Sequence, residues 1–74
     1  MPDADVPLFA RVLRVELERR SWTLADLARE SRMEAPTVWR YLNGERRAPF
    51  DAVVQMLAAM GKSLTWLDRQ MKGA

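Results

Sequence analysis

The sequence predicts an all-α fold, and three observations lead to this prediction. Apolar residues recur at three- and four-residue spacing along successive short stretches. No stretch alternates between apolar and polar residues for more than a few positions, so strands are not expected. Prolines, capping residues and glycines mark the ends of the apolar stretches. We therefore expect five short helices in one domain over residues 7–74, after a flexible segment over residues 1–6.

The first two helices are predicted between residues 7 and 31. Residues 7–20 form the first helix, with Asp5 placed to cap it. Thr23 and Asp26 have the spacing of a capping box, so the second helix runs over residues 24–31. The side chains expected to face the core from these helices are Phe9, Val12, Leu13, Leu17, Leu24, Leu27 and Ala28.

Proline marks the start of the next two helices. Pro36 favours the first helical position and pushes Ala35 away from helical angles, so the third helix begins at Pro36. It ends at Asn43-Gly44, a C-terminal capping pair. The marks for the start and end of the fourth helix and for the cap of the fifth are Pro49, Gly61 and Ser63. The expected inward residues are Val38, Tyr41, Leu42, Phe50, Val53, Val54, Leu57, Met60, Leu64, Leu67 and Met71.

Composition argues against catalysis and metal binding. The chain has neither cysteine nor histidine, so it lacks thiolate and imidazole ligands and the commonest general base. Asp26 and Glu30, one helical turn apart, come nearest to a carboxylate pair, and a solvated helix surface accounts for them. We expect no enzyme activity, no metal and no cofactor.

Other sequence features bear on location and charge. No apolar run approaches the roughly twenty residues that a bilayer span needs, and no signal peptide is evident, so we expect a cytoplasmic protein with no membrane partner. The net charge is +2, and two acidic residues, Asp3 and Asp5, lie in the opening segment. The rest of the chain therefore carries 12 − 8 = +4. This mild basic bias suits a polyanionic partner as well as an ordinary soluble protein.

The second and third helices have the spacing of a helix-turn-helix. A small residue in the first helix lets the two helices cross closely, and apolar residues around the turn fix their angle at about 90–120°. The residues at these positions are Leu27, Ala28, Met33, Val38 and Tyr41. Over residues 12–67 the chain resembles the Cro and lambda-repressor-like family, also called XRE. The resemblance rests on the five-helix order, "LADLA", "NG" followed by basic residues and a proline, "LAAMG" and "LTWL".

Four positions depart from the family pattern. Arg32 stands where a glycine usually makes the turn, so it adopts left-handed angles at about 1 kcal/mol or the turn takes another shape. Leu24 replaces a glutamine that commonly reaches a DNA phosphate. Leu17 and Leu42 replace an arginine–glutamate pair that many members bury, and an apolar pair need not destabilise a core.

The resemblance implies that the outward side of the third helix enters the major groove of DNA. Arg40 is the best base-reading candidate, because its guanidinium can donate two hydrogen bonds to the O6 and N7 acceptors of guanine. The full base-reading set is Ala35, Pro36, Thr37, Trp39 and Arg40, of which Ala35, Pro36 and Trp39 suit thymine methyl groups. The phosphate-contacting set is Thr23, Asn43, Arg46 and Arg47, although Arg46 and Arg47 also fit an ordinary solvated loop.

Several aromatic and basic residues have other interpretations. Trp39 is a base contact, the centre of a protein interface, or a partly buried residue of a rotated helix. Trp22 and Trp66 are expected in the core. A solvated face of the first helix is expected to contain Arg11, Arg14, Arg19 and Arg20.

The resemblance implies a sequence-specific regulator of transcription, a phage repressor or antitoxin-like protein. It would bind a palindromic operator in double-stranded DNA as a homodimer, because one small domain makes few base contacts. The fifth helix is the expected dimer surface, through Leu64, Trp66, Leu67 and Met71. The alternative from another class is an adaptor that grips a toxin, a polymerase subunit or a nuclease through the surface around Trp39.

Overall fold

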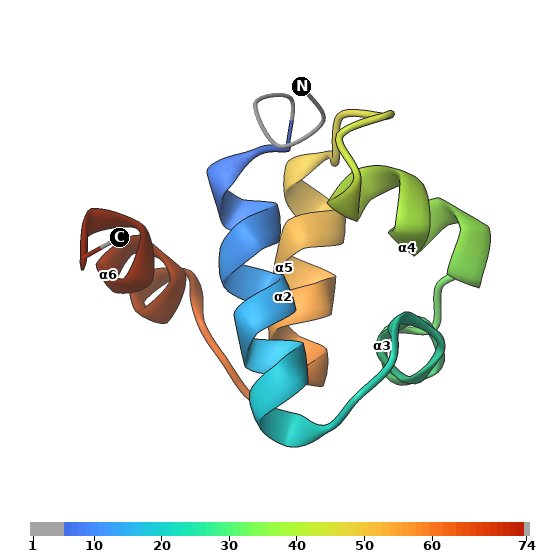
Figure 1. The fold of residues 1–74 in the computed structure, drawn as a ribbon, viewed down its shortest axis with the longest axis horizontal. Helices are drawn as coiled ribbons and strands as arrows, with labels where there is room; N and C mark the ends of the chain where they lie inside the picture. The colour runs from blue at the N-terminus through green and yellow to red at the C-terminus, as the bar shows by residue number, and fades with distance from the viewer. Residues whose placement is uncertain (1–5, 74) are drawn as a thin grey trace.

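The computed structural model describes residues 6–73, which fold into five helices without a strand in that range (Figure 1). The helices are α2 (Leu8–Arg20), α3 (Leu24–Ser31), α4 (Ala35–Leu42), α5 (Phe50–Ala59) and α6 (Leu64–Gly73). The all-α prediction with five helices is confirmed. Most of the segment expected to be flexible, with Asp5, lies outside the described residues, while Val6 packs half-buried against the core.

The helices are arranged around α2 and α3. α3 packs against α4 and α5, and α2 packs against α4 and α6. In Figure 1, α6 lies at one side of the molecule, whereas α3 and α4 lie at the other side. No helix within residues 6–73 is long and apolar enough to cross a membrane. α4 and α6 therefore lie on different sides of the molecule.

The core draws on every helix. Its buried apolar residues are Ala10, Leu13, Leu17, Leu27, Ala28, Val38, Tyr41, Leu42, Ala52, Met56, Leu57, Met60 and Leu67. The prediction for α5 was partly wrong, because Phe50 and Val54 are 66% and 37% exposed. α5 is apolar around much of its circumference, so spacing alone did not fix which side packs inward. The buried side follows Ala52, Met56 and Met60 at four-residue spacing.

The helix starts agree with the capping predictions at two places. The Thr23 Oγ1 atom accepts a hydrogen bond from the Asp26 N–H at 3.1 Å, and the Asp26 carboxylate accepts one from the Thr23 N–H at 2.8 Å. The Ser63 Oγ atom accepts one from the Trp66 N–H at 3.1 Å. Capping boxes satisfy amides that the helix itself leaves without partners.

The starts predicted from proline were each one residue off. Pro7 and Pro49 are extended N-cap residues and not the first helical residues of α2 and α5. α4 begins at Ala35, and Pro36 lies in its first turn. Proline removes no hydrogen bond there, because first-turn amides have no partner within the helix. Glu34, not Ala35, has the extended angles that precede α4.

Two helix ends use residues other than glycine with positive φ, in addition to Gly44 and Gly61 after α4 and α5. Arg32 has φ 59° and ψ 40°, so the first of the two alternatives for the turn, a left-handed arginine, is correct. The Met33 N–H then donates to the Ala28 carbonyl oxygen at 2.9 Å. Ser21 has φ 58° at the end of α2, and no feature of the sequence predicted this angle. The left-handed Arg32 thus reverses the chain after α3 and leads it into α4.

Candidate nucleic-acid interface

The inner face of α4 holds this helix on the domain. Val38, Tyr41 and Leu42 are buried, as the spacing predicted, and they pack against α3 and α2. Because residues three and four apart share a helix face, the other side of α4 must point outward. The short turn over residues 32–34 leaves α4 at the edge of the molecule (Figure 1).

The outer face of α4 contains the predicted base-reading residues. Trp39 is 46% exposed, and Ala35, Pro36 and Arg40 are also exposed. Thr37 is half-buried. The third interpretation of Trp39, a partly buried residue on a rotated helix, does not fit this exposure. The helix therefore presents an indole, a proline and a guanidinium together on its outer side.

The loop after α4 brings two further cations near this helix. Arg46 and Arg47 are exposed, and the Arg46 N–H donates to the Arg40 carbonyl oxygen at 3.4 Å. The two arginines line a hollow of about 440 Å³ together with Phe9 and Val53. The positive charge of the loop thus lies next to the end of α4, where a polyanion bound to α4 would pass.

The other two phosphate candidates have partners within the protein. The Thr23 hydroxyl is exposed but accepts the Asp26 N–H in the capping box, so only its own O–H is left to donate. The Asn43 Oδ1 atom accepts a hydrogen bond from Arg14 at 2.8 Å. The Asn43 Nδ2 atom donates to the Trp39 carbonyl oxygen at 2.8 Å. Both residues flank the interface, and their roles as phosphate contacts stay predictions.

Arg14 links α2 to the end of α4, contrary to its predicted place on a solvated face. Its Nη2 atom donates to the Leu42 carbonyl oxygen at 3.2 Å and its Nε atom to the same oxygen at 3.4 Å. The side chain is half-buried. The sequence did not reveal these contacts, because one acceptor is a main-chain carbonyl that every residue possesses and the other, Asn43, lies 29 positions away in the sequence.

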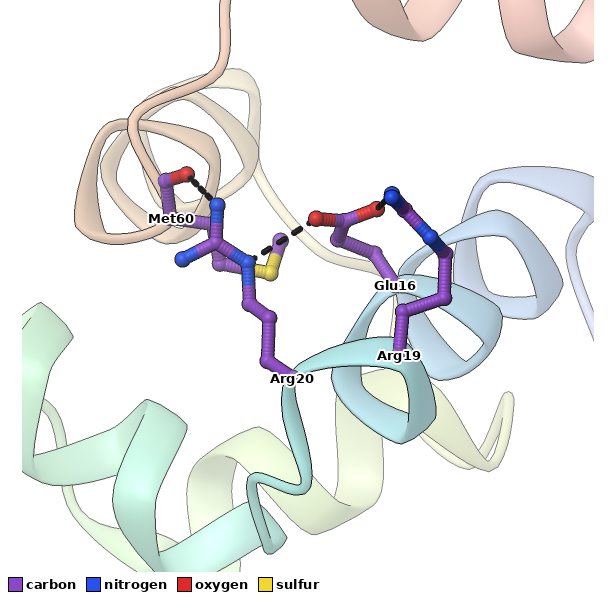
Figure 2. Close-up of polar contacts among 4 residues, drawn as sticks. All are labelled: Glu16, Arg19, Arg20 and Met60. Carbon is purple, nitrogen blue, oxygen red and sulfur yellow. Dashed lines mark hydrogen bonds and ion pairs between the residues drawn. The ribbon is translucent and has the colours of Figure 1, made fainter.

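Arg20 and Arg19 converge on a buried carboxylate (Figure 2). The Glu16 side chain is only 5% exposed, and its two oxygens accept bonds from Arg19 at 2.8 Å and Arg20 at 2.9 Å. Arg20 also donates to the Met60 carbonyl oxygen and lies over the Trp22 ring, 5.3 Å from its centre. The solvated face predicted for these arginines is therefore wrong for Arg20. Glu16 lies between Leu13 and Leu17 on the inward face, and this spacing was the signal that could have revealed it.

The surroundings of Glu16 also set its charge state. Burial raises the pKa of this carboxyl, but the hydrogen bonds from Arg20 and Arg19 outweigh burial and hold the pKa below its ordinary value. Its negative charge therefore persists at neutral pH. The arrangement fastens the end of α2 to the end of α5 and lies away from α4 (Figures 1 and 2).

The carboxylate pair noted in the sequence lies on a solvated helix surface. The Asp26 pKa is lowered by the Thr23 N–H and then by Arg29, whose Nη2 atom lies 3.0 Å from the carboxylate. Glu30 is exposed and lies 3.7 Å from Arg29. Within residues 6–73, no three side chains of the metal-binding types come close enough together to hold an ion.

The residues predicted for a dimer surface mostly pack on their own chain. Leu67 is buried, and Trp66 and Met71 are half-buried against the core. Leu64 is 41% exposed, so its predicted place on the inward face is wrong. A groove of about 340 Å³ between α2 and α6 is lined in part by Val15 and Trp66. The dimer surface stays a prediction, and Leu64 is its most accessible member.

One protein-family model matches the part of the chain that contains these helices. The sequence model of the family described as "Helix-turn-helix domain" matches residues 8–69, a stretch that includes α3, the turn with Arg32, α4 and the basic loop. No curated protein and no solved structure matches the chain. The match covers most of the 74 residues, and the function implied by this family is DNA binding in transcription regulation. The chain belongs to the helix-turn-helix domain family.

Proposed function

We propose that this protein is a sequence-specific DNA-binding regulator of transcription, of the Cro and lambda-repressor-like type. In this proposal α4 lies in the major groove of an operator, and the protein acts as a repressor by occupying that site. The observation that carries the proposal is the outer face of α4, where Trp39 and Arg40 are exposed beside the basic loop. The protein would act by binding rather than catalysis, without a metal or cofactor, in the cytoplasm at the nucleoid.

Base contacts and phosphate contacts have different roles in this proposal. Arg40 reads a guanine, because a guanidinium can donate two hydrogen bonds to its O6 and N7 acceptors. Trp39 and Pro36 meet thymine methyl groups and exclude water from the contact. Arg46 and Arg47 bind phosphates, which position the protein on any duplex without reading its sequence.

A homodimer on a palindromic operator completes the proposal. One α4 of eight residues reaches few base pairs, whereas two copies reach half-sites about one helical turn apart. The exposed Leu64 and the groove between α2 and α6 supply apolar surface for a second copy. Sedimentation should show a dimer at the concentration at which DNA is bound, and a monomer both free and on DNA would contradict this part of the proposal.

The deciding experiment measures binding to duplex DNA as a function of salt. The protein should bind random duplex at low salt, and each neutralised phosphate should contribute about −0.9 to the logarithmic slope. Selection from a random DNA pool should then return a two-fold symmetric site. Absence of binding at low salt, or an affinity that salt does not change, would refute DNA binding.

A second candidate function is a protein-binding adaptor centred on Trp39. The same exposure of Trp39 favours it, because tryptophan and arginine are common anchors of protein interfaces. The partner would be a toxin, a polymerase subunit or a nuclease. In a variant with Trp39 as the sole tryptophan (Trp22→Phe and Trp66→Phe), operator DNA should shield the indole from a quencher if α4 reads DNA. Unchanged quenching on DNA would favour the adaptor.

A further inference from the structure

A series of hydrogen bonds runs from the middle of α2 to the last turn of α4. Arg14 donates through Nη2 to the Asn43 Oδ1 atom at 2.8 Å, and through Nη2 and Nε to the Leu42 carbonyl oxygen at 3.2 and 3.4 Å. Asn43 in turn donates from Nδ2 to the Trp39 carbonyl oxygen at 2.8 Å. This series of hydrogen bonds therefore links α2 to Trp39, the residue at the centre of the exposed face of α4.

We propose that Arg14 and Asn43 are positioning residues, which fix the angle at which α4 presents Trp39 and Arg40 to DNA. This inference rests on the proposed function, since it concerns how the DNA-reading helix is held. In this inference the Asn43 side chain bonds to Arg14 and to the Trp39 carbonyl within the protein and does not contact a DNA phosphate. Neither residue needs to touch DNA for this role.

The chemistry of a helix end explains why an arginine suits this place. The last carbonyl groups of a helix lack partners within the helix and bear partial negative charge, so a guanidinium there satisfies an acceptor and complements the helix dipole. α4 has only eight residues, and its N-cap residue, Glu34, makes no capping bond through its side chain. The C-terminal end with Arg14 and Asn43 is therefore where polar contacts hold the helix.

Asn43 transmits this restraint to the turn that reads DNA. Its amide group bridges the Arg14 guanidinium and the Trp39 carbonyl, and its backbone N–H also donates to the Trp39 carbonyl at 3.0 Å. Small changes in the angle of α4 would move its outer side chains away from base edges but leave phosphate contacts in the loop largely intact. The expected effect of losing Arg14 is thus on discrimination between sequences.

The test compares Arg14→Ala with Lys72→Ala, which also removes one positive charge but lies on α6, across the molecule from α4 (Figure 1), where Lys72 makes only an exposed ion pair with Asp68. Affinity is measured for the selected site and for random duplex at the same salt. Arg14→Ala should reduce the ratio of the two affinities about tenfold, whereas Lys72→Ala should leave the ratio unchanged. Equal ratios in the two variants would overturn the inference.

Three further variants separate positioning from phosphate contact. Asn43→Ala should also reduce the affinity ratio, and the double variant with Arg14→Ala should lose little more than either single variant, because both break one chain of bonds. If Asn43→Ala instead weakens both duplexes alike, Asn43 binds a phosphate and the inference is wrong for it. Arg14→Lys retains the charge but not the forked donor, so it should recover only part of the ratio.

Hydrogen exchange without DNA keeps the inference testable whatever the DNA result is. In Arg14→Ala, the amides of Asn43 and Glu45, which donate to α4 carbonyls, should exchange faster while those in the middle of α5 keep their protection. Unchanged protection at Asn43 and Glu45 would show that Arg14 does not hold the end of α4. If the wild-type protein binds no duplex at all, the proposed function fails, and this measurement still decides the role of Arg14.

Discussion

α4 and α6 are two short helices that each contain one tryptophan, yet they use it in opposite ways. Trp39 of α4 is exposed, whereas Trp66 of α6 is half-buried and packs against the core. Lys62 lies over the Trp66 ring, 5.1 Å from its centre. α4 is held by its other face, through Val38 and Leu42. The fold therefore places the indole of α6 on its own chain and leaves the indole of α4 at the surface.

This difference separates stability from recognition. Burial of Trp66 and Leu67 attaches α6 to α2, so their apolar surface contributes to folding. Trp39 leaves 46% of its surface exposed, and large exposed aromatic side chains on a protein surface commonly mark sites of interaction. Substitutions on the two helices should consequently have different consequences, and these can be measured separately.

The largest expected effect is the contrast between Trp66→Ala and Trp39→Ala. Trp66→Ala should lower the free energy of unfolding by about 3 kcal/mol, since a large packed side chain is lost. Trp39→Ala should change it by no more than about 0.5 kcal/mol, as at other exposed positions, but should abolish preference at thymine-bearing positions of the selected site. Urea unfolding and competition binding give the two values. Equal destabilisation by both substitutions would contradict the contrast.

A second expected effect distinguishes α4 from the loop that follows it. Arg40→Ala should cost about 1–3 kcal/mol of binding free energy on the selected site and relax preference at one base pair per half-site. Arg47→Ala should weaken all sequences alike and reduce the salt slope by about one. Both are measured by titration of selected and random duplexes. An equal loss on both duplexes in Arg40→Ala would assign Arg40 to a phosphate instead of a base.

The sequence predicted those features of the fold that depend on neighbouring residues. The bounds of α3 and the Thr23 capping box depend on residues three or four apart, and both were confirmed. The inward face of α4 followed for the same reason, since Val38, Tyr41 and Leu42 lie three and four residues apart and so share one face of the helix. The start at Ala35 was missed because a proline fits more than one position of a first turn.

The contacts of Arg14 and Arg20 could not be predicted in the same way. Each side chain donates to a main-chain carbonyl of a distant helix, and carbonyls leave no mark in a sequence. The exposure of Phe50 was missed because α5 has more apolar residues than one face can bury. The surface around Trp39 was predicted as a candidate, but only the packing of α4 decided that its indole points outward.

A third expected effect concerns the α6 side of α2, where Glu16 lines the groove with Trp66. Glu16→Gln should reduce stability at neutral pH by about 1–2 kcal/mol, because it removes charge-assisted hydrogen bonds from Arg19 and Arg20. The folded-state pKa lies below its ordinary value of 4.5, so the carboxylate stabilises the fold above that value. This stabilisation is lost as the pH falls through and below 4.5.

The pH dependence supplies the control for Glu16. Urea unfolding between pH 7 and pH 3 should show the wild-type protein and Glu16→Gln approaching the same stability as the pH falls. A constant stability difference across the pH range would mean that the charge of Glu16 does not account for the effect.

The smallest expected effect lies in the turn that leads into α4, at Arg32. A side chain at φ 59° is strained by roughly 1–2 kcal/mol relative to glycine, while glycine adds about 0.4–1 kcal/mol of freedom to the unfolded chain. Arg32→Gly should therefore stabilise the protein by about 0.5 kcal/mol, seen as a rise in Tm of about 2–4 °C.

Arg32→Ala is the matched control, because it removes the same charge but keeps the Cβ atom that causes the strain. If both variants gain equally, relief of charge repulsion and not backbone strain explains the gain, and if Arg32→Gly gains nothing the strain at this residue does not exceed the freedom that glycine adds to the unfolded chain. Arg32→Gly retains the same turn angles, so it should leave the preference for the selected site unchanged, and the added stability should not be accompanied by any change in what α4 reads.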